Sequence, residues 1–204
     1  MSIDLQSIGI KTVQEALEKG ALVFSEANKT EDFDRACDHI LILLEDSFQC
    51  FQRESWGTSV FLSITAIEEV AKAKIGLYRR EGQTEQVKRG KDKLFNHQEK
   101  HRMAVLPTVF MGTRLEDALG KERCSGLLKE AAYGDFRNLR ESSLYFTKIE
   151  GQFITPANVV PKERAKEFLL LAIQTADDSL VGYTGHTSII ENRMNEIFSA
   201  VSHS

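Results

Sequence analysis

Apolar residues recur at intervals of three and four along most of this chain, the spacing that places them on one face of an α-helix. Residues 11–27 follow this pattern and predict a first amphipathic helix. Thr30 precedes two acidic residues, which favours the start of a second helix that runs to about residue 51. A third predicted helix begins near Trp56, is apolar on nearly all sides over its first half, and ends at Gly82. We therefore expect it to be the central helix of a bundle.

The same periodicity predicts five further helices along the rest of the chain. They cover about residues 84–102, 114–132, 136–142, 161–181 and 187–201. The segment LYFTKIEGQFITP differs, because its β-branched and aromatic residues flank Glu150 and Gly151, a pattern typical of a small hairpin. The sequence predicts a single all-α domain over residues 1–204, with a β-hairpin appended.

Composition narrows the classes of function. A net charge of -4 and a pI near 5.8 argue against a surface coated with basic residues for duplex nucleic acid, but leave room for a local basic site. The three cysteines form no CxxC pair, so neither a zinc site nor a disulfide framework is indicated. The first 20 residues lack the pattern of a signal peptide, and the apolar stretches are too short to span a membrane. We expect a cytoplasmic protein.

The predicted central helix carries charged residues in its middle. Glu68 aligns with Ile64 and Ala71 on the most apolar face, where a carboxylate is costly unless a partner neutralises it. Lys72 follows at i+4, so an ion pair within the helix is the simplest explanation. Glu69 lies beside this pair. A partner from another helix is the alternative.

A basic cluster occupies residues 88–102. This segment contains six lysines and arginines but only two acidic residues. On a helix, Lys93, His97, Lys100 and His101 would share a face. Such a cluster suits contacts with phosphate, although for the lysines alone a solvated helix face is the favoured interpretation. His97 differs from the lysines because an imidazole exchanges protons near neutral pH.

A third cluster lies in the segment YGDFRNLRESSLYF. Arg137 and Arg140 are one helical turn apart, and Tyr145 follows five residues later. Arginine binds phosphate with two nitrogens, and a tyrosine hydroxyl donates to the same oxygens. Alternatively, Arg140 pairs with a glutamate of the central helix and has no chemical role. Both interpretations are compatible, and we expect Glu68 to meet Lys72, His97 and Arg140.

A bound metal is not indicated by the sequence. Helical di-iron proteins carry Glu-x-x-His motifs, and this spacing does not occur in the chain. We therefore expect neither a metal site nor another cofactor.

Three segments together resemble the AbiV-type abortive infection proteins, a branch of the HEPN superfamily. They are SITAIEEVAKAKIG, FNHQEKH and RESSLYFTKIEGQFITP, and the likeness extends from about residue 59 to residue 176. The resemblance implies a HEPN-like helical bundle that forms a homodimer and serves in bacterial defence against phage. It also implies a phage protein as trigger, or an antitoxin as partner.

Many HEPN proteins are metal-independent ribonucleases, so the resemblance also implies RNA as substrate. The usual Arg-x4–6-His signature is absent, since Arg35 lies four positions before His39 and Arg89 eight before His97. Tyr145 follows Arg140 where the usual histidine would stand. The catalytic residues expected from this likeness are His97 as base, with Arg140, Tyr145, Lys100, Glu68, Glu69 and Lys72. The expected RNA-binding residues are Lys93, His101, Arg102 and Arg137.

Two functions remain open from the sequence. One is a ribonuclease toxin, and the low overall basicity favours a single-stranded or small RNA as its substrate. The other is a non-catalytic HEPN module that arrests growth through a protein or nucleotide partner, with the polar residues forming a buried network. Exposure of Glu68, His97, Arg140 and Tyr145 on an open cleft would favour catalysis.

Overall fold

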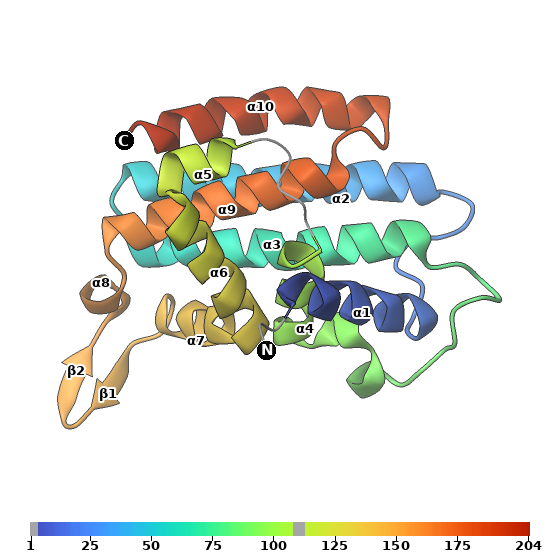
Figure 1. Cartoon of the computed structure of the whole chain (residues 1–204), viewed down its shortest axis with the longest axis horizontal. Coiled ribbons are helices and arrows are strands. Elements are labelled where there is room, and N and C mark those ends of the chain that lie inside the picture. Colours follow the sequence, from blue (N-terminus) through green and yellow to red (C-terminus); the bar gives the residue numbers. More distant parts are fainter. Residues whose placement is uncertain (1–3, 108–112) are drawn as a thin grey trace.

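The computed structural model describes residues 4–107 and 113–204. Four long helices lie side by side in its upper part (Figure 1). They are α2 (Lys29–Gln52), α3 (Trp56–Tyr78), α9 (Lys162–Leu180) and α10 (Gly185–Ser202). Helix α3 packs against both α2 and α9, and α10 covers the opposite side of that pair. The all-α bundle expected from the periodicity is confirmed.

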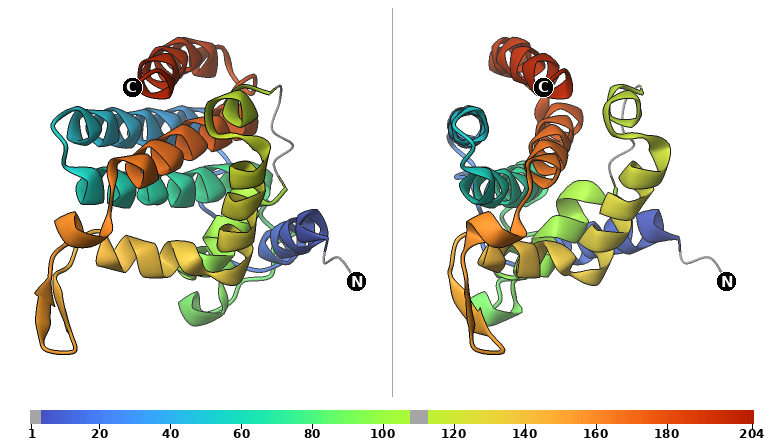
Figure 2. Two further views of the ribbon diagram at one scale, coloured as in Figure 1. Left: turned by 60° about the vertical axis from the view of Figure 1, so that its left-hand side comes forward. Right: turned by 90° about the vertical axis from the view of Figure 1, so that its left-hand side faces the viewer.

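Shorter helices cover the side of α3 that faces away from α10 (Figures 1 and 2). They are α1 (Leu5–Glu18), α4 (His97–Val105), α6 (Lys121–Tyr133) and α7 (Asp135–Ser142). Helix α4 packs against α3, α1 and α6, and α7 packs against α3. Helix α5 (Arg114–Leu119) bridges α6 and α9. Residues of α3 are thus surrounded on nearly every side.

The burial of α3 confirms its central place. Val60, Ile64 and Ile67 of α3 are fully buried and join the same apolar cluster as Phe168 of α9. At the start of α3, a Cβ atom on Gly57 would lie 2.6 Å from the carbonyl oxygen of Ser143, just after α7. Only glycine permits this approach, so α7 sits close against α3. No helix in the described part of the chain is both long and apolar enough to cross a membrane.

The predicted hairpin is present. Strands β1 (Thr147–Ile149) and β2 (Gln152–Ile154) pair antiparallel. Glu150 and Gly151 between them have φ angles of 49° and 85°, the positive values that a tight two-residue turn requires. A one-turn helix, α8 (Pro156–Val159), follows, and Pro161 precedes α9.

The helix predicted over residues 84–102 is wrong for its first half. That region is irregular, with two single 3₁₀ turns, η1 (Arg89–Lys91) and η2 (Lys93–Phe95). Asn96 ends the irregular stretch because its side chain accepts from the amide of Glu99 and caps α4. The helix predicted over 114–132 is split at Gly120, where φ is 82°. The first helix, predicted over residues 11–27, spans Leu5–Glu18 instead: it starts earlier because Asp4 caps it, and the prediction is wrong for residues 19–27.

A buried ion pair fixes this irregular region. The guanidinium of Arg79 is 1% exposed and donates to both oxygens of Asp92, at 2.8 and 3.0 Å. Its remaining bonds go to the carbonyl oxygens of Ala16, Lys19 and Ala21. These bonds tie the end of α1 to the end of α3 and to the segment that leads into α4.

Candidate functional site

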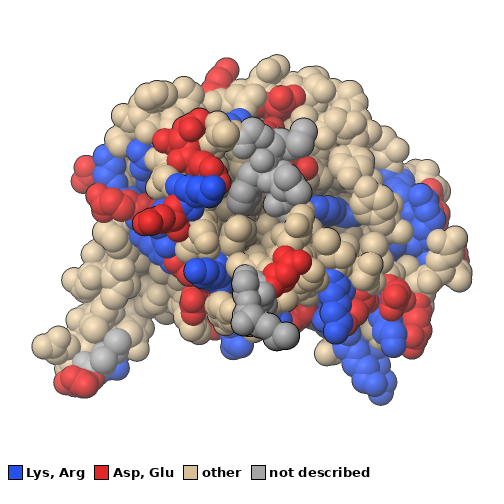
Figure 3. All heavy atoms as spheres, viewed as in Figure 1, with Lys and Arg blue, Asp and Glu red and all other residues tan. Residues whose placement is uncertain are grey.

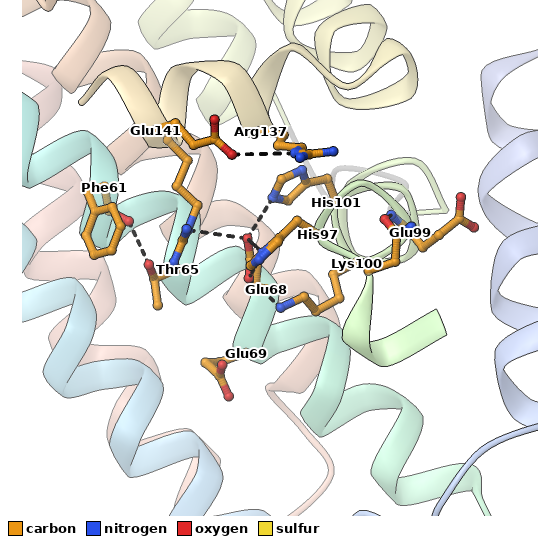
Figure 4. A network of polar contacts seen from close by, with 12 residues as sticks. Phe61, Thr65, Glu68, Glu69, His97, Glu99, Lys100, His101, Arg137 and Glu141 are labelled. Atoms are coloured by element: carbon orange, nitrogen blue, oxygen red, sulfur yellow. Dashed lines mark hydrogen bonds and ion pairs between the residues drawn. The ribbon is translucent and has the colours of Figure 1, made fainter. Parts of the chain in front are cut away.

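The candidate site is built around Glu68, in the middle of α3. Its side chain is 3% exposed, yet four basic residues from two other helices converge on the carboxylate (Figure 4). His97, Lys100 and His101 come from α4, and Arg140 comes from α7.

The two carboxylate oxygens share these partners unequally. Nδ1 of His97 lies 2.8 Å from Oε1 and 2.9 Å from Oε2. Nε2 of His101 lies 3.1 Å from Oε1, and Nζ of Lys100 donates to Oε2. Nε of Arg140 is 3.6 Å from Oε1, an ion-pair distance beyond a direct hydrogen bond. Each oxygen of Glu68 therefore has at least two basic neighbours.

Local sequence explains why these side chains meet. Positions 97, 100 and 101 are related by i, i+3 and i+4, so on α4 they share one face, and that face lies against α3. Arg140 is held from a second direction, since its guanidinium carbon lies 4.6 Å from the centre of the Phe61 ring. Phe61 and Glu68 are seven residues apart on α3 and share a face.

Electrostatics favour the ionised form of Glu68. Burial by itself raises the pKa of this carboxyl, but the hydrogen bond from His101 and the charge of Lys100 outweigh burial and lower the pKa to about 2. Burial lowers the pKa of His101, which favours a neutral ring that donates from Nε2. Its Nδ1 atom has no hydrogen-bond partner among the described residues. The pair of Glu68 and Lys100 therefore carries the charge of the buried part.

Only part of the cluster reaches solvent. Glu68, Lys100 and His101 are buried, whereas the side chain of His97 is 43% exposed and that of Arg140 is 23% exposed. Of the four residues whose exposure on a cleft would favour catalysis, Glu68 is therefore buried, and His97 is exposed but is not among the residues that line the hollow beside Arg140. A surface hollow of about 680 Å³ adjoins Arg140 and is also lined by Tyr145, whose side chain is 64% exposed.

The family follows from a comparison with family models. The model described as AbiV, within the HEPN group, matches residues 33–176. The chain belongs to the AbiV family. The match runs from α2 into α9 and includes Glu68, the α4 residues, Arg140 and the hairpin. A search of curated proteins gave no match, and a search of solved structures gave none.

In this AbiV-family protein, Lys72 pairs with Glu69 rather than with Glu68 and lies outside the site. Its ammonium lies 2.5 Å from Glu69, three positions earlier on α3, and both side chains are partly exposed. The predicted pair of Glu68 and Lys72 is therefore wrong, because Lys100 of α4 binds the glutamate instead. Figure 4 shows Glu69 away from the group of bases around Glu68. Glu69 and Lys72 form a separate pair at the edge of the helix.

All four residues expected to bind RNA have partners within the protein, and three of them are also partly or fully buried. Lys93 lies in η2 rather than α4 and pairs with Glu15 and Glu99, at 2.7 and 2.8 Å. Arg102 donates to the carbonyl oxygen of Ala132 and pairs with Glu99. His101 is 0% exposed, so its predicted contact with RNA is wrong.

Arg137, the fourth, remains largely open to solvent. Its side chain is 63% exposed and lies 3.6 Å from Glu141, one turn along α7 (Figure 4). Salt bridges of this exposed kind are weak, so the guanidinium remains available to a phosphate. Arg137 therefore remains an RNA-contact candidate.

Metal ligands do not gather in the described residues. No group of three or more His, Cys, Asp or Glu residues there has an arrangement that could hold an ion. Cys37, Cys50 and Cys124 are buried and free. The chemistry available at the site is that of an imidazole and a guanidinium beside a buried carboxylate.

Proposed function

We propose that this AbiV-family protein is a metal-independent ribonuclease in which His97 is the general base. The observation that carries the proposal is the contact of His97 Nδ1 with both oxygens of Glu68, while the same side chain is 43% exposed. A carboxylate that accepts from Nδ1–H fixes the tautomer of the ring and leaves Nε2 as the proton acceptor. The buried acid thereby supports a base at the surface.

The proposed reaction uses the groups at the exposed edge of the cluster. Nε2 of His97 takes the proton of a ribose 2′-hydroxyl, and the 2′ oxygen attacks the adjacent phosphorus. The bond from phosphorus to the 5′ oxygen breaks, the leaving oxygen takes a proton from water, and a 2′,3′-cyclic phosphate remains. Arg140 stabilises the charge on the phosphoryl oxygens, and Tyr145 donates a hydrogen bond to them.

Lys100 has a supporting role in this proposal. Its ammonium is buried against Glu68 and does not reach the surface. It keeps the carboxylate ionised, and an ionised Glu68 stabilises the imidazolium that forms when His97 takes a proton. Lys100 is therefore a positioning residue, whereas the sequence suggested a direct contact with the phosphate.

Family membership extends the proposal to biology. We propose that the protein acts in the bacterial cytoplasm as a homodimer during abortive infection. There it damages RNA once a phage protein triggers it or an antitoxin releases it. The shared family supports this role, since abortive infection is what the AbiV description denotes.

A non-catalytic binding module is the second candidate. Glu68, Lys100 and His101 are 3%, 5% and 0% exposed, as in polar networks that only fix how helices pack. In that case, growth arrest comes from a protein or nucleotide partner bound at the surface. The two candidate functions therefore predict different results when His97 is removed. A ribonuclease would stop cleaving RNA, whereas a binding module would leave RNA intact with or without His97.

Growth arrest in bacteria tests the two functions. Cells express the wild type, His97→Ala or Arg140→Ala, total RNA is run alongside, and folding is checked by circular dichroism. His186→Ala is the matched control, because His186 also pairs with a carboxylate, Asp38 at 2.6 Å, on an exposed part of the molecule. The ribonuclease proposal predicts RNA fragmentation and arrest that both site variants lose and His186→Ala keeps. Arrest with intact RNA in every strain supports the binding module.

A further inference from the structure

Exposed aromatic side chains gather on and beside the hairpin. Tyr145, Phe146 and Phe153 are 64%, 69% and 59% exposed, although rings of this size usually bury most of their area. The hairpin projects away from the helices (Figure 2). In Figure 3 its visible face is largely free of charged side chains, which appear mainly toward its tip. This projection therefore offers rings to solvent.

The strand register places two of these rings on one face. Lys148 pairs with Phe153 across the hairpin, and Phe146 lies just before β1, two residues ahead of Lys148. Side chains two residues apart point to the same side of a strand, so Phe146, Lys148 and Phe153 share a face. The ring centres of the two phenylalanines are 5.0 Å apart. We call these three residues the aromatic face.

The aromatic face continues into the hollow beside Arg140. Phe146 lines that hollow together with Tyr145 and Arg140. Nε of Arg140 has no hydrogen-bond partner among the described residues, and its ion pair with Glu68 is long, at 3.6 Å. A guanidinium at the rim of a hollow, next to exposed rings, suits a ligand that has both phosphates and flat bases.

We propose that the aromatic face and the hollow bind single-stranded RNA. Bases stack on Phe146, Phe153 and Tyr145, while backbone phosphates contact Arg140 and Lys148. The inference rests on the proposed function, because it supplies the substrate class of the same site and directs the strand toward His97. A duplex is excluded from this platform, since its bases already stack on each other.

Charge favours RNA over a protein as the occupant. An apolar protein surface laid on the aromatic face would remove the ammonium of Lys148 from water without neutralising it, which is costly. A strand instead provides a phosphate for this ammonium and a base for each ring. The net charge of -4 is consistent with a ligand bound largely by stacking rather than by many phosphate contacts.

Fluorescence anisotropy tests the inference on the full-length protein. The probe is a labelled 2′-O-methyl oligouridine of about 12 nucleotides, which cannot be cleaved through its 2′ oxygen and spans one such site. Phe146→Leu and Phe153→Leu keep apolar bulk but remove the ring. Each is expected to weaken binding about tenfold, within the range for loss of one stacked base. Tyr133→Leu is the control, because Tyr133 is 58% exposed on α6 and lies outside the hollow.

The outcomes separate this inference from the proposed function. Unchanged affinity in both leucine variants overturns the inference, as does a loss of self-association in light scattering with RNA binding intact. Cleavage that keeps its KM in these variants also overturns the inference and leaves the ribonuclease standing. Ring-dependent binding by a protein that cleaves no RNA supports the inference and overturns the ribonuclease. Thermal unfolding of each variant verifies that the exposed substitutions leave the fold intact.

Discussion

Nδ1 of His97 lies 2.8 Å from one oxygen of Glu68 and 2.9 Å from the other, although the two residues are 29 positions apart. This contact joins the first residue of α4 to the middle of α3. It explains why a carboxylate occupies the central helix of the bundle. Glu68 neutralises Lys100 in the interior and orients an imidazole at the surface, so one residue serves both stability and the proposed chemistry.

Loss of the Glu68 charge should destabilise the fold. Glu68→Gln leaves the ammonium of Lys100 buried without a counter-charge, and we expect a loss of about 3 kcal/mol in the free energy of unfolding. Urea unfolding at pH 7 measures the change. Glu69→Gln is the matched control, since its pair with Lys72 is partly exposed and should contribute at most about 1 kcal/mol. Equal losses in the two variants would contradict the role given to Glu68.

Acid should weaken the protein through the same carboxyl. The pKa of Glu68 is about 2 in the folded protein and 4.5 ordinarily, so folding is favoured by the ionised form. Its stabilisation is complete above pH 4.5 and is lost as pH falls toward 2, by roughly 3 kcal/mol in all. The lowered pKa of His101 acts in the same direction, because below pH 6.5 the unfolded chain takes up a proton that the buried ring resists.

Urea unfolding between pH 7 and pH 3 tests this dependence. The wild type should lose stability most steeply below pH 4.5, where Glu68 takes up a proton in the unfolded chain but stays ionised in the folded protein, and Glu68→Gln should start lower and show a flatter acid limb. Parallel curves for the two proteins would mean that Glu68 is not the group that titrates. Because the two proteins differ only at residue 68, their other carboxyl groups affect both curves alike.

The buried pair of Arg79 and Asp92 should be a second determinant of stability. Asp92→Asn removes the counter-charge of a guanidinium that is 1% exposed, and we expect a loss of about 3 kcal/mol. Glu85→Gln is the control, because the salt bridge of Glu85 with Lys19 is exposed and should contribute well under about 1 kcal/mol. Thermal unfolding measures both. A similar melting temperature for the two variants would refute the prediction.

Periodicity predicted the central helix and the hairpin well, because each depends on local patterns. Trp56 begins α3 as expected, and Glu150 with Gly151 forms the turn. The segment before α4 was not predictable in this way. Its sequence pattern predicted one continuous helix over residues 84–102. Instead, Asp92 accepts hydrogen bonds from Arg79, thirteen positions earlier, and this long-range ion pair outweighs the local helix propensity.

The site was partly predictable for the same reason. Spacing within α4 placed His97, Lys100 and His101 on one face. The free-energy cost of burying Glu68 without a partner also indicated that basic residues of other helices contact it. That Lys100 binds Glu68 and Lys72 does not was missed, because it depends on how α4 packs on α3, which no local pattern encodes. The sequence also did not predict which histidine is exposed to solvent. His97 and His101 have similar neighbours in sequence, but only His97 reaches solvent.

The hydroxyl of Tyr145 should affect cleavage but not RNA binding. Tyr145→Phe keeps the exposed ring that stacks on a base and removes the donor to the phosphoryl oxygens. We expect kcat to fall about tenfold, the effect of losing one hydrogen bond at an open site, with KM unchanged. Tyr145→Leu should raise KM as well. A fall in affinity for Tyr145→Phe alone would assign the hydroxyl to binding rather than to catalysis.

Cleavage of single-stranded RNA by the purified protein in the presence of a chelator tests the central claim most directly. The wild type should yield fragments that end in 2′,3′-cyclic phosphate, and His97→Ala should be slower by a factor of about 100 or more, as for loss of a general base. His186→Ala should cleave like the wild type. Equal cleavage by well-folded His97→Ala, or no cleavage by the wild type, would contradict the assignment of His97 as the base.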